Sequence, residues 1–154
     1  MRDYDLDFLR MAIETARKAR EHGNHPFGAV LVDAEGQFLM EAENTVNSEG
    51  DCTGHAETNL IRKAYSQLSP KTLAGSTLYT STEPCAMCSG AIFWGGVNRV
   101  VYALSEISLF DLTTGPNYLK MPCREVFFRS GRSIEVLGPL LVEEARKVHE
   151  GFWK

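Results

Sequence analysis

Two short motifs of this sequence bring together side chains that bind metals and transfer protons. Thr53-Gly54-His55-Ala56-Glu57 stands where a loop enters one expected helix, and Glu83-Pro84-Cys85-Ala86-Met87-Cys88 stands where a strand enters another. The C-x-x-C spacing places Cys85 and Cys88 on one face of the first helical turn, where the helix dipole and free N–H groups favour thiolate over thiol. This spacing is typical of a pair of metal ligands.

Two thiolates and one neutral imidazole are a suitable ligand set for zinc. Cys85, Cys88 and His55 would fill three of the four tetrahedral positions of Zn²⁺ and leave one for water. An open position indicates catalysis, because zinc held in this way lowers the pKa of its water to ~7. Glu57 stands at the same helix start as His55 and would transfer protons without binding the metal. The combination of H-x-E with P-C-x-x-C is typical of zinc deaminases.

A structural zinc site is the main alternative to a catalytic one. The remaining cysteines, Cys52 and Cys123, could supply a fourth ligand, which would close the coordination sphere. Cys52 is close to His55 in the sequence, so this alternative stays open. A lone C-x-x-C is also compatible with a redox motif. For Cys52 and Cys123 we expect the ordinary role of a small, unreactive thiol.

The composition indicates one globular domain over residues 1–154. The chain is 44% apolar and 23% charged, which suits a compact domain with its own core. Its net charge of −4 argues against a nucleic-acid binder, which needs a basic surface. No apolar run approaches the ~18 residues of a membrane span, and the first residues are too acidic for a secretory signal. We therefore expect a cytoplasmic protein without membrane attachment.

The pattern of apolar residues and turns predicts alternating helices and strands. Helices are expected over residues 5–21, 55–69 and 85–94, with a last helix that begins at Pro139. Strands are expected over residues 28–32, 37–45, 76–81, 99–104 and 133–137. The first two strands form an antiparallel hairpin, and a parallel crossover with room for another helix precedes the last strand. The predicted fold is a three-layer α/β/α sandwich with a mixed five-stranded sheet, which places both motifs at its ligand-binding edge.

The order of these motifs resembles the cytidine deaminase-like superfamily, in the branch of guanine, cytosine and tRNA adenosine deaminases. The segments that match are Pro26–Val30, Asn44, His55–Glu57, Glu83–Ala91 and Arg99–Val101. The resemblance implies one zinc ion per chain on His55, Cys85 and Cys88, and Glu57 as proton shuttle. It also implies a homodimer.

The resemblance further implies which residues bind the substrate. Asn44 matches an asparagine that hydrogen-bonds the substrate ring; without the resemblance, it would be interpreted as a turn residue. Phe27 suits guanine deaminases better than tRNA enzymes, which usually carry valine there. Phe110-Asp111 resembles a pair in guanine deaminases whose acidic group holds the amidine edge of the base, although an aspartate at a helix start is ordinarily a cap. Trp153 resembles the C-terminal aromatic residues that form a lid in free-base deaminases.

Three functional hypotheses follow from the sequence. The first is hydrolytic deamination of a free nucleobase or related amino-heterocycle, guanine-like in preference, with cytosine as a variant. The second is a tRNA-specific adenosine deaminase, which the acidic charge and the departure from the usual Pro-Thr-Ala at Cys52-Thr53-Gly54 argue against. The third is a non-catalytic, zinc-stabilised domain, which the presence of Glu57 argues against.

Overall fold

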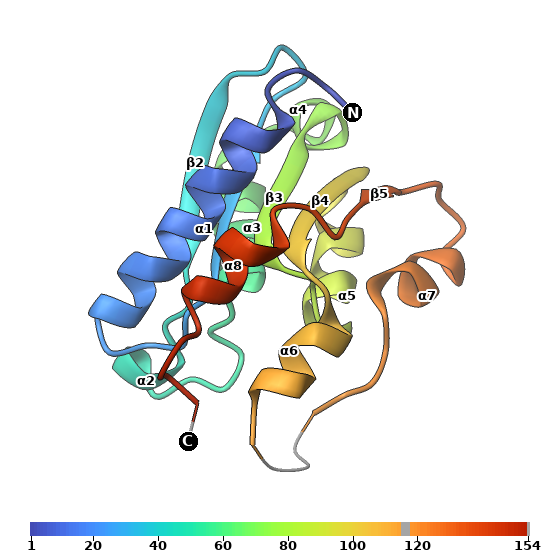
Figure 1. The fold of residues 1–154 in the computed structure, drawn as a ribbon. Helices are drawn as coiled ribbons and strands as arrows, with labels where there is room; N and C mark the ends of the chain where they lie inside the picture. Colours follow the sequence, from blue (N-terminus) through green and yellow to red (C-terminus); the bar gives the residue numbers. More distant parts are fainter. Residues whose placement is uncertain (115–117, 154) are drawn as a thin grey trace.

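The structure, a computed structural model, describes residues 1–114 and 118–153, and a mixed five-stranded sheet lies at its centre (Figure 1). The strands are β1 (Gly28–Val32), β2 (Phe38–Glu43), β3 (Thr77–Thr82), β4 (Arg99–Leu104) and β5 (Glu135–Leu137). They are arranged in the order β2-β1-β3-β4-β5. β1 is antiparallel to both β2 and β3, whereas β4 is parallel to both β3 and β5.

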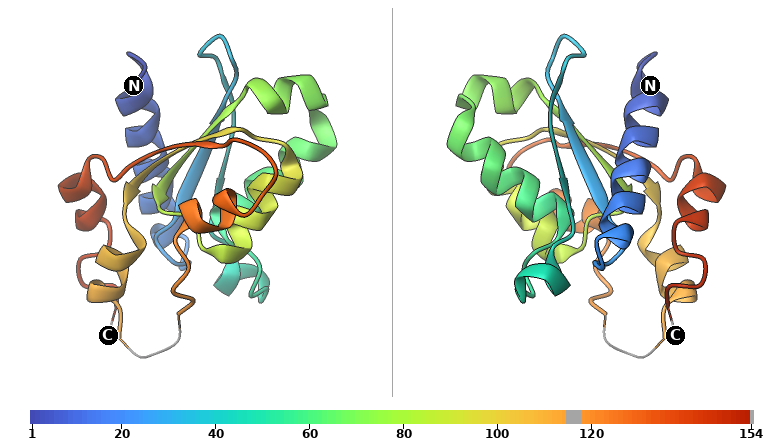
Figure 2. Two further views of the ribbon diagram at one scale, coloured as in Figure 1. Left: turned by 90° about the vertical axis from the view of Figure 1, so that its right-hand side faces the viewer. Right: turned by 90° about the vertical axis from the view of Figure 1, so that its left-hand side faces the viewer.

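Helices cover both faces of the sheet (Figure 2). They are α1 (Asp5–Glu21), α2 (Val46–Glu49), α3 (Ala56–Gln67), α4 (Pro70–Gly75), α5 (Ala86–Gly95), α6 (Glu106–Leu112), α7 (Cys123–Phe128) and α8 (Val142–Lys147). The side chains of β1 alternate between two cores: Leu31 packs with residues of α3 and α5, and Val30 packs with residues of α1 and α8. This arrangement confirms the predicted three-layer α/β/α sandwich. Among the described residues, no helix has the length and apolar character to cross a membrane.

The strands expected over residues 37–45 and 133–137 are shorter than predicted, and two predicted helix boundaries are wrong. The expected helix over residues 55–69 ends at Gln67, because Ser69 caps the separate helix α4 by accepting a hydrogen bond from the Thr72 amide at 3.1 Å. The last helix begins at Val142 and not at Pro139, because the Leu140 amide still donates to the carbonyl of Ala103 on β4. The segment between β4 and β5, which has room for another helix by its length, contains the short helices α6 and α7 in its described part.

Candidate metal and active site

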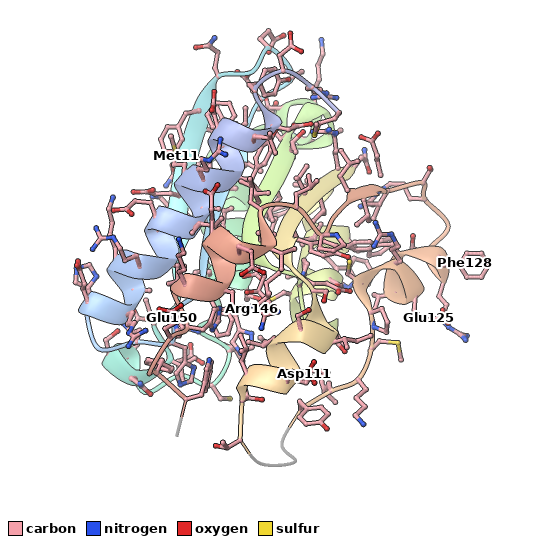
Figure 3. The ribbon with its side chains drawn as sticks, in the orientation of Figure 1. Met11, Asp111, Glu125, Phe128, Arg146 and Glu150 are labelled. Atoms are coloured by element: carbon pink, nitrogen blue, oxygen red, sulfur yellow. The ribbon has the colours of Figure 1, made fainter. Side chains whose placement is uncertain are left out.

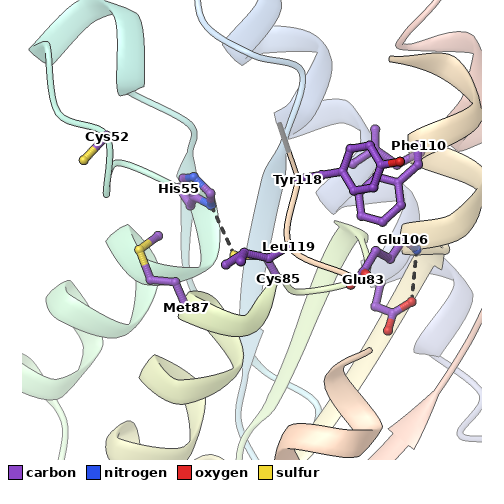
Figure 4. Close-up of a pocket in the computed structure, with 10 residues that line it drawn as sticks. Cys52, His55, Glu83, Cys85, Met87, Glu106, Phe110, Tyr118 and Leu119 are labelled. Atoms are coloured by element: carbon purple, nitrogen blue, oxygen red, sulfur yellow. Dashed lines mark hydrogen bonds between the residues drawn. The ribbon is translucent and has the colours of Figure 1, made fainter. Parts of the chain in front are cut away.

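Three possible metal ligands meet where two helices begin, at the carboxyl end of β3. His55 immediately precedes α3, Cys85 immediately precedes α5, and Cys88 lies in the first turn of α5. Their ligand atoms all lie within 4.8 Å of one another, and Nδ1 of His55 is 3.5 Å from Sγ of Cys85 (Figure 4). Two cysteines with one histidine are a donor set that zinc prefers. The residues present therefore fit a zinc ion.

Hydrogen bonds within the cluster favour ionisation of one thiol. The Cys88 thiol and then His55 hydrogen-bond to Cys85, and together they lower the pKa of Cys85 to about 4. The pKa of Cys88 is raised, chiefly because its thiol donates to Cys85 and because it is buried. Oγ1 of Thr58 lies 3.2 Å from Sγ of Cys88 and is a further partner for that sulfur. A bound divalent cation favours the thiolate form of both cysteines.

Glu57 is buried beside the same cluster. It lies in the first turn of α3, and only 6% of its surface is exposed. Burial, together with the negative charge of Cys85, raises the pKa of Glu57 to about 7. A carboxyl group with this pKa can both hold and release a proton at neutral pH, as proton transfer to and from a substrate requires.

Two adjoining cavities lie next to the cluster. An inner cavity of about 90 Å³ is lined by Phe27, His55, Glu57, Thr82, Glu83, Cys85 and Leu109. An outer cavity of about 470 Å³ is lined by Cys52, His55, Glu83, Cys85, Met87, Glu106, Leu109, Phe110, Tyr118 and Leu119 (Figure 4). The rings of Phe110 and Tyr118 are stacked, with their centroids 4.0 Å apart. Flat aromatic and apolar walls of this kind suit a planar heterocycle.

Asn44 lies beside the inner cavity with an unused hydrogen-bond donor. Its backbone amide donates to the carbonyl of Phe27 at 3.1 Å, and Phe27 lines that cavity. Its Oδ1 accepts a hydrogen bond from the Val46 amide at 3.0 Å, whereas its buried Nδ2 has no partner among residues 1–114 and 118–153. A buried donor without a partner is costly. Asn44 is not itself among the lining residues of either cavity.

Two other predicted substrate residues lie outside the cavity walls. Asp111 is on the exposed side of α6 (Figure 3), and its neighbour Phe110 is the one that lines the outer cavity. Trp153 reaches the inner cavity only through Phe27, with the ring centroids 6.2 Å apart. Its Nε1 donates to Nδ1 of the buried His149 at 3.0 Å.

Sequence reasoning missed two acidic residues of the cavity walls. Glu83 lines both cavities, and its place two residues before the C-x-x-C motif was the available signal. Glu106 is 7% exposed, and burial together with the nearby Glu83 raises its pKa to about 7. No periodicity in the sequence distinguishes it from a surface residue in the first turn of a helix.

The two remaining cysteines are not part of the ligand cluster. Cys52 is exposed and lines the outer cavity, and Cys123 is buried at the start of α7. Within the described residues, the group that could hold a metal contains neither of them. The geometry thus supports a site with three protein ligands.

Comparisons with known proteins agree with this geometry. Residues 2–104 match the family model of the cytidine and deoxycytidylate deaminase zinc-binding region. A probable cytosine deaminase of Schizosaccharomyces pombe is 44% identical over an alignment of 157 positions, gaps included. The alignment covers 97% of this chain and 92% of that protein. A tRNA-specific adenosine deaminase of Haemophilus influenzae is 33% identical over an alignment of 155 positions, which covers 99% of this chain and 84% of that protein. The solved structure of guanine deaminase from Bacillus subtilis has a TM-score of 0.65 at 31% identity, over 96% of this chain and 91% of that one.

Proposed function

This chain belongs to the zinc-binding cytidine and deoxycytidylate deaminase family, whose members hydrolyse C–N bonds of nucleobases or nucleosides, and we propose that it deaminates a free, guanine-like base. The observation that carries this proposal is the buried Glu57 beside His55, Cys85 and Cys88 at the inner end of a cavity. Those three residues would hold one zinc ion. When bound, zinc supplies a Lewis acid that activates water and stabilises negative charge.

Glu57 would carry the protons of the reaction. It takes a proton from the water that adds to the amine-bearing carbon and passes it to the adjacent ring nitrogen. It then moves the proton of the newly added hydroxyl group to the amino group, so that the C–N bond breaks, ammonia leaves and a carbonyl remains. Asn44 would offer its free Nδ2 to an acceptor of the ring, and Phe27 and Leu109 would pack against the ring faces.

The size and lining of the two cavities support a bicyclic substrate. Because the cavities share His55, Glu83, Cys85 and Leu109, a base whose reacting ring lies near Glu57 can extend into the outer cavity. The aromatic pair of Phe110 and Tyr118 lines that outer space. The net charge of −4 argues for a small molecule over a polynucleotide.

Cytosine is the second candidate, and the observation that favours it is the 44% identity to the probable cytosine deaminase of S. pombe over nearly the whole chain. The experiment that decides is ammonia release from guanine, cytosine, adenine and their nucleosides, beside inosine formation in a tRNA anticodon stem-loop at several salt concentrations. We expect guanine turnover. Activity on cytosine alone would retain the mechanism and refute the purine assignment, and tRNA editing without any free-base activity would replace the proposal.

We also propose that the protein is a homodimer that associates through α3 and α5. Trp94 and Tyr65 are 79% and 64% exposed, and both line a shallow groove on these helices together with Ile61, Ala91 and Gly95. Large aromatic side chains exposed side by side are typical of an interaction surface.

We further propose that residues 1–154 form one deaminase domain that acts in the cytoplasm, where reducing conditions keep metal-binding thiols available.

A further inference from the structure

Two described segments, residues 106–114 and 118–123, form the outer wall of the cavity, and one carboxylate holds the first residue of the former and the last residue of the latter. Oε1 of Glu83 accepts a hydrogen bond from the backbone amide of Glu106 at 3.0 Å (Figure 4). Oε2 of the same side chain accepts one from the backbone amide of Cys123 at 2.9 Å. Glu106 is the first residue of α6 and Cys123 the first residue of α7, positions whose amides have no acceptor within their own helix.

These two segments supply much of the cavity lining. Their residues that line the outer cavity are Glu106, Leu109, Phe110, Tyr118 and Leu119. The position of this wall relative to the metal ligands therefore depends on where the Glu83 carboxylate is held.

Glu83 is itself firmly placed. Its backbone amide donates to the carbonyl of Leu104 at 2.7 Å, at the end of the neighbouring strand β4. In the chain, Glu83 directly precedes Pro84 and the metal-ligand candidate Cys85. One residue thus connects the end of β4, the metal cluster and both segments of the cavity wall.

We propose that Glu83 is a positioning residue that sets the width of the substrate cavity by holding two wall segments, residues 106–114 and 118–123, at the amides of Glu106 and Cys123. Hydrogen bonds from amides to a carboxylate are shorter and stronger than those to a neutral acceptor, so both amides are held tightly. Glutamine has one carbonyl oxygen and can accept from only one of the two amides, since its NH₂ group is a donor. The effect on substrate choice rests on the proposed function, whereas the fastening of the wall does not.

This role predicts a particular kinetic change. Glu57 and the three metal ligands lie in the first turns of α3 and α5 or directly before them, not in the wall, so loosening the wall leaves the proton-transfer group and the metal in place. Substrate contacts made by the wall are lost in the ground state and the transition state alike, which raises KM and leaves kcat nearly unchanged. We expect KM for the preferred base to rise about tenfold in Glu83→Ala, with kcat within about threefold of wild type.

The experiment compares Glu83→Ala and Glu83→Gln with the control Glu125→Gln. Glu125 lies on α7, pairs with the exposed Arg129 and lines neither of the two cavities. The first measurement is amide hydrogen exchange by NMR, together with zinc content. In Glu83→Ala we expect the hydrogen-exchange protection of both the Glu106 and the Cys123 amide to fall at least about tenfold. In Glu83→Gln we expect the protection of only one of these two amides to fall. The amides of β3 should stay protected and zinc should remain at one equivalent.

Unchanged protection of both amides in Glu83→Ala would overturn the proposal, as would loss of protection throughout β3 and β4, which would show a general structural role. A fall in kcat with KM unchanged would also refute it. If Glu83→Ala does not fold, Glu83→Gln decides the question, because it should lose hydrogen-exchange protection at one of the two amides. If the wild-type protein deaminates no heterocycle, the proposed function fails, but hydrogen exchange still tests the fastening.

Discussion

Nδ1 of His55 lies 3.5 Å from Sγ of Cys85, although the two residues are 30 positions apart in the chain. Their proximity results from the close packing of α3 against α5. At the far end of α5, a Cβ on Gly95 would stand 2.7 Å from Cγ2 of Ile61 on α3, so the absence of a side chain at Gly95 permits the approach. The metal site is thus a product of helix packing as well as of its ligands.

Replacement of a metal-ligating cysteine should remove the zinc. Cys85→Ala or Cys88→Ala takes away a ligand and a negative charge, so zinc should fall well below the one equivalent per chain expected of the wild type. Cys52→Ala is the matched control and should keep its zinc, because Cys52 is exposed and outside the ligand cluster. Elemental analysis of the purified proteins measures this, and full occupancy in Cys85→Ala would refute the ligand assignment.

Glu57→Gln should keep the fold and the zinc and lose at least ~10²-fold in turnover, the low end of what a general acid–base residue contributes. The amide has nearly the shape of the buried carboxyl group but cannot transfer protons. The control is Glu35→Gln, at an exposed position in the turn between β1 and β2. The measurements are kcat on a confirmed substrate and zinc content. Wild-type turnover in Glu57→Gln would exclude the proton-transfer role.

Deletion of residues 152–154 should weaken action on a free base. Trp153 packs against Phe27 of the inner cavity, and Phe152 packs against His25 with ring centroids 6.0 Å apart. Phe27, which lines the cavity, would lose the support of Trp153, and a loss of about 1 kcal/mol in base binding would raise KM about fivefold. Phe38→Ala, which truncates an exposed aromatic residue on β2, is the control. Steady-state kinetics would contradict the expectation if the shortened chain bound its base as tightly as the intact one.

Stability should fall on acidification because of His149. Burial, with the positive charges of Arg20 and Arg146 nearby, lowers the pKa of His149 to about 4 from 6.5. Between these two values the unfolded chain binds the extra proton and the folded chain does not, so the free energy of unfolding decreases as pH falls through that range. Protonation also removes the Nδ1 acceptor that Trp153 uses. From pH 7 to pH 5 the loss should be about 2 kcal/mol.

The control for this pH effect is His149→Gln, whose side chain carries a hydrogen-bond acceptor but does not titrate. Urea unfolding of both proteins at pH 7 and pH 5 measures the difference. Equal losses of stability in the wild type and in His149→Gln would show that another group is responsible.

The proposed dimer should dissociate when a charge is placed on its face. Trp94→Glu introduces a carboxylate where the wild type exposes a large indole on α5, and burying it unpaired would be strongly unfavourable. Light scattering after size exclusion should give twice the 17.2 kDa chain mass for the wild type and the single mass for the variant. Phe38→Glu on β2 should remain dimeric, and a monomeric wild type at micromolar concentration would refute the dimer.

The sequence predicts the chemistry of the site and the class of fold from local patterns. The chemistry follows from residue types at short spacing, since Cys85 and Cys88 are three apart at a helix start and Glu57 is two residues after His55. The α/β class follows from the alternation of apolar strands with amphipathic helices, which local periodicity reveals. Each of these patterns involves residues that are only a few positions apart in the chain.

Which side chains form the cavity wall depends on the tertiary packing. One step along α6 turns the side chain by about 100°, so Phe110 lines the cavity and Asp111 lies in solvent. The start of the last helix depends on a hydrogen bond between Leu140 and Ala103 on another element. The side chain of Glu83 accepts its two hydrogen bonds from backbone amides that are 23 and 40 residues away in the chain. Such contacts depend on how distant segments pack together, so local sequence patterns do not predict them.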